Sequence, residues 1–532
     1  MSVAERVPVP EVGAPGAKGL KTGALGMISN IVIGVASTAP AYSLAVSLGL
    51  VVAAVGIYSP SIMWVAFLPM LCIAFAYYYM NRADPDCGTS FTWVTRAMGP
   101  HLGWMTGWAI IVADVIVMAS LAEVAAQYTF SLFGVDWATS PIWPVDIAGQ
   151  TIDVAIVGLG ILFIAVLTWI CYVGIELSAR TQVVLLAIEL FALAVFSVVA
   201  LYKIYAGLGP EGSMTPTLEW LNPFAIVSAD GSFDTSAFAA ALVIALFIYW
   251  GWDTTATTNE ESANPTEQPG RATIIATLIL VATYVIVSIA AQAWAGTTAL
   301  ADAGESDIFA IMGSQVLGSP WDKLLILAVL TSAAASTQTT ILPTARTALS
   351  MGAKGALPSM WAKMHPTFQT PTNATIWMGI LSVAFYVGLK LVSENIYYDA
   401  LAALGLMIAF YYGLTGYACA IYYRHQLLRS VKDFILVGVL PILGGLALTW
   451  GFYQSAVDLR DPANSYSGVE WFGVSVPLAI TIASFILGLV LMLLWWWRDP
   501  TFFRRRPETF HVEATPGAPT LRPASGTGTA GH

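Results

Sequence analysis

The stretch from Thr22 to Asn81 contains no Asp, Glu, Lys or Arg, and this feature limits the possible folds more than any other. About 20 apolar residues suffice for a helix to cross a bilayer, so the stretch is too long for one crossing. Gly56 and Pro60 mark a turn between two crossings. The whole chain is 57% hydrophobic and 10% charged, whereas soluble domains carry roughly 25% charged residues. We therefore predict an all-α integral membrane protein.

Apolar segments of membrane-spanning length recur along the chain. We predict about twelve transmembrane helices, at residues 24–48, 59–81, 101–131, 152–173, 179–205, 236–259, 272–295, 321–349, 373–392, 397–423, 433–455 and 472–497. The two ends of the chain are rich in Pro, Gly, Ala and Thr and lack apolar periodicity. We therefore predict disordered cytoplasmic tails at 1–20 and 501–532.

Basic residues divide unequally between the two sides of the predicted membrane protein. With an even number of spans both termini share a side, and 18 of the 22 basic residues lie there. The other four are Lys203, Lys323, Lys390 and Arg460. Because cytoplasmic loops accumulate Lys and Arg, we expect a multi-pass protein of the plasma membrane with both termini in the cytoplasm.

Charge and motif spacing disfavour several other functions. The formal net charge of −10 argues against a nucleic-acid partner. The five histidines are dispersed, and the four cysteines form no CxxC pair, so we predict neither a metal site nor a cofactor. No phosphate-binding glycine loop is present, which disfavours ATP-driven pumping.

Two predicted spans are interrupted by residues that break helices. The first contains Gly34, Ser37, Thr38 and Pro40 within IVIGVASTAPAY, and the sixth contains Gly251 within IALFIYWGWDTT. Inside a bilayer, unwound backbone is tolerated only where it faces protein or water. A broken helix in each half of such a chain indicates a transporter's binding site. The alternative is that Gly34 and Pro40 kink a helix and that Gly251 lets a neighbour pack closely.

Several motifs resemble those of the amino acid–polyamine–organocation permease superfamily. They cover about residues 20–425 and are IGVASTAPAY, PDCGTSFTWV, GIELSARTQ, FIYWGWDTT with NEESANP, and ARTALSMGAKGALPSMWAKMHPTFQTP. The resemblance implies a ten-helix core of the leucine-transporter type at 21–425, with inverted repeats at about 21–205 and 236–425 and two additional helices at 426–500. It also implies alternating access around unwound spans 1 and 6. In addition, it places Phe247 near the aromatic that closes over the substrate, although packing alone also explains such a ring.

The predicted breaks offer groups that complement an amino acid or a related amine. The N–H groups of Ser37, Thr38 and Ala39, at the start of a half-helix, would bind a carboxylate. Gly34 and Gly251 would let the substrate or a neighbouring helix approach. Carbonyls that end the first half-helices would bind an ammonium. We predict these carbonyls near Ile31, Val32, Phe247, Ile248 and Trp250.

Acids inside predicted spans are costly and usually face the bundle interior. Asp114 would contact the substrate or a cation, or bond a neighbouring helix. Glu123 lies near the outer third of its span, where contact with water is one explanation. Asp253 follows the glycine of the sixth span and would serve in coupling or gating, or cap the helix.

Glu189 departs from the pattern of the family that the chain resembles. Many proton-coupled relatives carry a lysine at this position, whose ammonium takes the place of a sodium ion. A carboxylate cannot imitate a cation, but it could hold a proton or help bind a sodium ion. Ser336 and Thr337 would then be nearby oxygen donors. The alternative is a structural bond to another helix.

The combined interpretation is a secondary active transporter that imports an amino acid or related amine, coupled to a proton or cation gradient. An exchanger of two organic solutes with the same fold is the nearest alternative. A polytopic membrane enzyme would need a catalytic cluster of His, Asp or Glu, which the dispersed residues do not suggest. A passive channel suits two separated breaks less well. Acids within the spans favour a cationic or zwitterionic solute, which leaves neutral amino acids, basic amino acids and polyamines.

Overall fold

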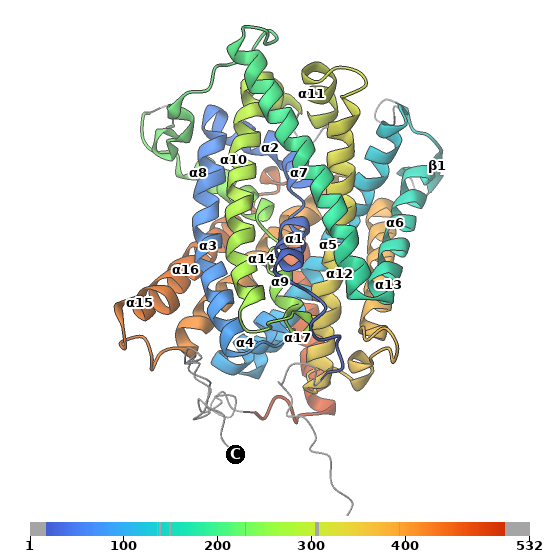
Figure 1. Cartoon of the computed structure of the whole chain (residues 1–532), viewed down its shortest axis with the longest axis vertical. Helices are drawn as coiled ribbons and strands as arrows, with labels where there is room; N and C mark the ends of the chain where they lie inside the picture. The colour runs from blue at the N-terminus through green and yellow to red at the C-terminus, as the bar shows by residue number, and fades with distance from the viewer. Residues whose placement is uncertain are drawn as a thin grey trace, which may run out of the picture.

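The computed structural model describes residues 18–135, 137, 140–147, 150–228, 230–303, 308–392 and 394–505. Its regular structure is almost entirely helical, in a bundle of long helices (Figure 1). In the described residues, 10 segments are long and apolar enough to cross a membrane. One of these, Met27–Ala83, contains several helices, and the apolar helix Thr235–Ile248 is shorter. The predicted all-α membrane fold is confirmed.

The helices follow the chain in two stretches that meet near residue 230. The earlier elements are α1 (Met27–Ser37), α2 (Pro40–Val55), a 3-10 turn (Gly56–Tyr58), α3 (Ser59–Ala83), α4 (Thr89–Met98), α5 (Pro100–Leu132), α6 (Val154–Val173), α7 (Ile175–Tyr205), and 3-10 turns at Leu218–Leu221 and Pro223–Ala225. The later elements are α8 (Thr235–Ile248), α9 (Thr254–Thr257), a 3-10 turn (Asn259–Glu261), α10 (Gln268–Ala303), α11 (Ile308–Val316), α12 (Lys323–Ala353), a 3-10 turn (Ser359–Ala362), α13 (Thr372–Val392), α14 (Glu394–Tyr422), α15 (Val431–Asp433), a π-helical segment (Phe434–Val439), α16 (Leu440–Asp458), a 3-10 turn (Pro462–Asn464) and α17 (Val476–Arg498).

Two small antiparallel hairpins lie in the connections between helices. Strand β1 (Pro144–Ile147) pairs with β2 (Gln150–Asp153), and β3 (Glu470–Trp471) pairs with β4 (Val474–Ser475). The strands of both hairpins are shorter than the roughly 9–11 residues that a membrane-spanning strand needs. The hairpins are therefore small additions to an all-α fold.

Burial divides the helices into central and peripheral ones. In the most apolar windows of α5 and α12, 83% of the residues are buried, whereas the figure for α6 and α17 is 28%. Exposed apolar side chains such as Trp169 and Val490 lie on these outer helices. In α12, small and hydroxyl residues at 331–340 let α5, α1 and α2 pack closely. The core of the molecule thus lies along α5 and α12.

Both ends of the described chain pack at the α4 end of the bundle (Figure 1). Lys18 is buried in ion pairs, and Leu20 is buried near Leu349. At the other terminus, Phe502 is buried against Phe91 of α4, with ring centroids 5.9 Å apart. At these two places, Leu20 and Phe502 of the predicted tails are packed against the helices. The rest of the predicted tails, 1–17 and 506–532, lies outside the described residues.

Candidate functional site

The two helix breaks meet at the centre of the bundle. Helix α1 ends at Ser37 and α2 begins at Pro40, with Ala39 between them in the left-handed region (φ 47°). In the second break, Gly251 separates α8 from α9. The hydroxyls of Ser37 and Thr254 share a hydrogen bond of 2.8 Å. The two interruptions that the sequence separates by some two hundred residues therefore form one site.

Glycine is required where these breaks touch. Gly251 has a φ of +116°, and a Cβ placed on it would lie 2.6 Å from the carbonyl oxygen of Ser37. A Cβ on Gly34 would lie 2.6 Å from Cγ2 of Thr255. Real Cβ atoms essentially never approach other atoms so closely. Both predicted glycine positions are thus places where one broken helix approaches the other.

The N–H groups predicted to receive a substrate carboxylate have backbone partners in this conformation. Those of Thr38 and Ala39 donate to the carbonyls of Val35 and Ala36, each at 3.2 Å. Ser37 lies within α1, which stays helical to that residue. The structure thus differs from the prediction, because α1 ends in tight turns that use these donors.

Glu189 of α7 occupies the N-terminus of α2 instead. Its Oε1 accepts hydrogen bonds from the N–H of Ala41 and the hydroxyl of Ser332, each at 2.8 Å. The N–H of Tyr42 donates to the same serine oxygen at 3.1 Å. The free N–H groups and dipole at a helix N-terminus stabilise a negative charge. The carboxyl group at this helix end is therefore supplied by the protein itself.

The α12 hydroxyl that bonds Glu189 lies one helical turn before the predicted oxygen donors, Ser336 and Thr337. Glu189 contacts Ser332, whereas Ser336 donates to the carbonyl of Ser37 at 2.9 Å. Thr337 donates to the carbonyl of Ala333 in its own helix at 2.7 Å. Among the described residues, Oε2 of Glu189 is buried without a hydrogen-bond partner. An oxygen in that state can take a proton or a cation.

Four of the five backbone carbonyls predicted to bind an ammonium, those of Ile31, Val32, Phe247 and Ile248, are also engaged. Ile31 and Val32 lie inside α1, where carbonyls accept bonds from the next helical turn. The carbonyl of Phe247 accepts the backbone N–H three residues further on, at 3.0 Å. The carbonyl of Ile248 accepts the hydroxyl of Tyr284 at 2.6 Å. A cationic group at this site would therefore depend on side-chain acids more than on these carbonyls.

Two of the predicted acids face one small cavity at the breaks. Its lining includes Asp114, Asp253, Trp250 and Gly251. The carboxylate of Asp114 also accepts a hydrogen bond from the hydroxyl of Thr344. Both interpretations of Asp114 are thus compatible, since it bonds a neighbouring helix and faces a cavity.

Asp253 is surrounded by tyrosine hydroxyls. Tyr412 donates to Oδ1 at 2.8 Å, and Tyr77 and Tyr411 donate to Oδ2 at 3.3 and 3.4 Å. The carboxylate makes no capping bond to α9. The helix-capping explanation for Asp253 is therefore not supported, and its carboxylate belongs to a network that joins α3, α9 and α14.

A larger cavity of about 630 Å³ opens at the other end of the bundle from Lys18. Phe247 lies in its lining, as do Glu123 and Lys390. Nζ of Lys390 is 2.8 Å from Oε1 of Glu123. The Glu123 side chain is buried, and its carboxylate also accepts hydrogen bonds from Tyr386 at Oε2 and from Gln127 at Oε1. Glu123 thus has a protein partner and does not depend on water.

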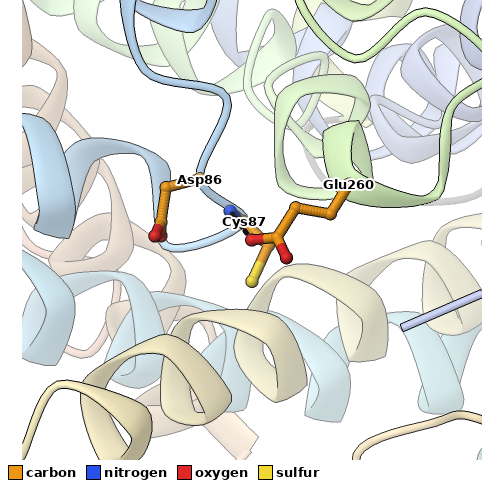
Figure 2. Close-up of side chains that lie close together, drawn as sticks. All are labelled: Asp86, Cys87 and Glu260. Atoms are coloured by element: carbon orange, nitrogen blue, oxygen red, sulfur yellow. Dashed lines mark hydrogen bonds between the residues drawn. The ribbon is translucent and has the colours of Figure 1, made fainter. Parts of the chain in front are cut away.

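A buried ion cluster lies between the ends of the described chain. Asp86, Cys87 and Glu260 have ligand atoms within 4.8 Å of one another, and their side chains converge from two segments (Figure 2). Nζ of Lys18 lies 2.8 Å from Asp86 and 2.5 Å from Glu260, and Nζ of Lys354 lies 2.9 Å from Asp86. The lysine ammonium groups therefore fill the role that a metal ion would have. We name Lys18, Asp86, Glu260 and Lys354 the latch cluster.

Asp86 and Lys18 of the latch cluster stay ionised over a wide pH range. Burial raises the pKa of Asp86, but Lys18 and Lys354 outweigh this and hold it well below its ordinary 3.8. Burial lowers the pKa of Lys18, but Asp86 and Glu260 hold it well above its ordinary 10.5. Asp86 therefore loses its stabilising charge only as pH falls below about 4, and Lys18 only as pH rises above about 10.

Sequence reasoning missed most partners of the predicted residues. Ser332, Thr344 and Tyr412 are ordinary helix residues, and a single sequence carries no signal of which acid they bond. The sequence carries a weak indication of the latch cluster. The motifs PDCG, NEES and GAKG place charged residues in short connections beside apolar spans.

Substitution of Gly251 with leucine should abolish transport of any solute that uses the central site. The side chain would collide with the backbone at Ser37 and would be strained at a positive φ. Solute uptake and binding would be measured in reconstituted vesicles, with Gly388→Leu as a control because no atom lies within 4 Å of a Cβ there. Normal uptake by Gly251→Leu would remove the site from this position.

Loss of the Lys18 charge should loosen the α4 end of the molecule. Cys87 is buried beside Asp86 and Glu260 of the latch cluster, so its labelling by a maleimide reports opening. With the other three cysteines replaced by alanine, Lys18→Gln should raise the labelling rate about tenfold, or about 1.4 kcal/mol. The ratio should stay constant between pH 6 and 8, because the Lys18–Asp86 pair does not titrate there.

Lys21→Gln provides a matched control for this experiment. Lys21 forms an ion pair with Glu176 in which both side chains are close to half exposed, so its loss should change little. Equal labelling rates for Lys18→Gln and Lys21→Gln would contradict a closing role for the latch cluster.

Comparison with known proteins identifies the family of the chain. The profile of the family described as amino acid permease matches residues 22–493. The chain is 25% identical over 337 residues to "Cationic amino acid transporter 4, vacuolar" of Arabidopsis thaliana, which covers 61% of this chain and 51% of the plant protein. It is 22% identical over 424 residues to "Branched-chain amino acid permease BcaP" of Lactococcus lactis (76% and 83%), and 22% identical over 415 residues to "Methylthioribose transporter" of Bacillus subtilis (76% and 80%). The chain spans about half the length of the plant relatives it matches. The match over most of its length shows that the chain belongs to the amino acid permease family, a family of transporters and not of enzymes.

Proposed function

We propose that the protein is a secondary active transporter that imports a cationic or zwitterionic amino acid, or a related amine, by alternating access. One observation carries this proposal: the two broken helices meet at a small cavity that faces Asp114 and Asp253. A large cavity lies toward one end of the bundle and the latch cluster lies at the other. A central site between one open and one closed end suits transport by alternating access.

The carboxylates at the central site favour a positively charged group on the solute. Asp114 and Asp253 both line the small cavity, so an anionic side chain there would meet repulsion. An ammonium or guanidinium group would be attracted. The relatives named as cationic amino acid transporters agree with this preference, while those named as branched-chain amino acid permeases and as a methylthioribose transporter define the alternatives to test.

The distribution of basic residues supports the orientation of the protein. Both described ends and the latch cluster share the end of the bundle where the basic connections lie. Because positive loops remain in the cytoplasm, we propose that this end is cytoplasmic. A location in the plasma membrane is part of the same proposal. The large cavity then faces outward, as import requires.

Glu189 is the group through which we expect an ion gradient to act. It joins α7 to the N-terminus of α2 and to Ser332 of α12, so a change in its charge affects three elements at once. Its buried Oε2, without a partner among the described residues, is the position for a proton or a sodium ion. Binding there would alter how firmly α2 is held against α12.

Uptake into proteoliposomes would test the substrate class. Labelled L-arginine should accumulate, and unlabelled L-lysine should compete better than L-leucine, because the central acids attract a second positive charge. Asp114→Asn should reduce L-arginine uptake about tenfold and L-leucine uptake less. Accumulation of methylthioribose with no uptake of any amino acid or amine would overturn the proposal.

Glu189→Gln should separate coupling from transport. The amide keeps the shape and can still accept the N–H of Ala41, but it cannot carry the charge that attracts a proton or cation. Concentrative uptake along an imposed gradient should fall at least tenfold, while exchange at equal concentrations should survive in large part. Both would be measured over pH 5.5–8 and with or without sodium.

The outcome distinguishes coupling from a structural role for Glu189. If its function were structural, the substitution would reduce folding or slow both transport modes alike. Gradient-driven uptake at the wild-type level by correctly folded Glu189→Gln protein would sink the coupling proposal. Dependence on neither pH nor sodium in the wild-type protein would favour the organic-solute exchanger.

A further inference from the structure

A basic and apolar surface lies where the chain leaves α14 and approaches α16. The connection 423–430 joins two membrane-spanning segments, Asp399–Tyr422 and Val431–Asp458. Tyr422 packs with Val94 of α4, so the connection lies at the α4 end of the bundle. Figure 1 shows α15 at the outer edge of the bundle, at the free end of α16. The connection therefore lies where the hydrocarbon core of a bilayer meets the lipid headgroups.

The segment that follows the connection is longer than a bilayer requires. Val431–Asp458 has 28 residues, which extend about 42 Å as a helix. The hydrocarbon core is only about 30 Å thick. A span of excess length commonly tilts, and its end turns then lie at the headgroups. We therefore expect α15 and the start of the π-helical segment to lie along the membrane boundary.

Apolar side chains are exposed on this part of the protein. Leu428 is 91% exposed and Val431 is 77% exposed, and Phe434 and Ile435 are both close to half exposed. Val431, Phe434 and Ile435 have the spacing of residues on one helix face. An apolar face of this kind indicates an interaction site. At the membrane boundary, its side chains can enter the acyl region of the leaflet.

Positive charge accompanies the apolar face. Between residues 423 and 435 the one acidic residue is Asp433, whose Oδ2 accepts the hydroxyl of Ser430 at 2.9 Å. The Lys and Arg residues of the same stretch are all exposed, and they are Arg424, Arg429 and Lys432. In the described part of the chain, neither Arg429 nor Lys432 has an ion-pair partner. The surface thus combines exposed apolar side chains with an excess of positive charge.

We propose that this surface binds an anionic phospholipid of the surrounding leaflet. Arg429 and Lys432 bind the headgroup phosphate, and Leu428 and Val431 lie among the acyl chains. Basic side chains beside a membrane attract anionic lipids, and buried apolar side chains add to the binding. Phosphatidylcholine offers the same acyl chains, but its choline cation offsets its phosphate, so the surface selects the anionic lipid. The lipid site is independent of which solute the protein carries.

A fluorescent probe on the surface would test this proposal. In full-length protein with its four cysteines replaced by alanine, Leu428→Cys would be labelled with bimane. The protein would be reconstituted in phosphatidylcholine vesicles that contain a small fraction of spin-labelled phosphatidylglycerol or spin-labelled phosphatidylcholine. The nitroxide would be on the acyl chain close to the headgroup. Phosphatidylglycerol should quench the probe about tenfold more strongly than phosphatidylcholine, because the basic side chains attract its headgroup.

Neutralising the basic side chains should remove this preference. With Arg424→Gln, Arg429→Gln and Lys432→Gln combined, the quenching ratio should fall to about one. Quenching by phosphatidylcholine should remain, because the apolar face is unchanged. Arg424 also donates to the carbonyl of Ile421 at 3.0 Å. Should the triple variant fold poorly, the pair Arg429→Gln and Lys432→Gln keeps that bond and should still lower the ratio about threefold.

A matched control separates a local site from the net charge of the protein. Arg180→Gln, Arg498→Gln and Arg504→Gln together remove the same charge from exposed positions on other segments, and the ratio should not change. An equal loss of preference in this control would overturn a local site.

Two further outcomes would also contradict the proposal. Equal quenching by the two lipids, with all three basic side chains present, would overturn selection of an anionic lipid. Protection of the probe from both lipids would overturn lipid binding, and a doubled mass of the complex would then identify a second copy of the chain as the occupant.

Discussion

A bilayer leaves no water to satisfy the backbone groups that a broken helix exposes, and this requirement organises the centre of the molecule. At the first break, Ser336 donates to the carbonyl of Ser37, and Glu189 accepts the N–H of Ala41. At the second, Tyr284 donates to the carbonyl of Ile248. Each break is therefore stabilised by side chains from neighbouring helices. The position of the site depends on these partners as much as on the glycines that permit the breaks.

Glu189 changes the chemistry that a broken helix ordinarily offers. The N-terminus of α2 is a natural place for a solute carboxylate, yet the protein's own carboxylate accepts its first free N–H. A solute carboxylate would compete with Glu189 for that donor unless Glu189 were neutralised by a proton or paired with a cation. Ion binding at Glu189 and solute binding at α2 would then favour each other, which is the thermodynamic content of coupling.

The general fold was predictable because its determinants are local in the sequence. Charge-free stretches such as Thr22–Asn81 define spans, and Gly34, Pro40 and Gly251 define interruptions. The site was predictable only in location. Whether Thr38 has a free N–H depends on the turn with which α1 ends, and the sequence does not specify that turn. Whether Glu189 bonds Ser332 or Ser336 depends on how α7 and α12 are rotated against each other. The sequence analysis places Lys18 in a tail, because composition does not reveal that its ammonium pairs with two buried carboxylates, Asp86 and Glu260.

The contacts around the latch cluster indicate which ion pairs would have to break if the α4 end opens as the proposed alternating access requires. The N–H of Leu25 donates to the carbonyl of Glu261 at 3.0 Å, and the N–H of Ala263 donates to the carbonyl of Leu25 at 2.8 Å. These bonds tie the segment before α1 to the segment after α9. Lys18 and Glu260 lie on those two tied segments, so their ion pair can persist during movement. The contact from Lys18 to Asp86, beside α4, crosses to a different part of the bundle, as does the pair of Arg346 with Glu261. Opening of this end in an alternating-access cycle would therefore separate buried charges, and the cost of that separation would make the closed end a distinct state.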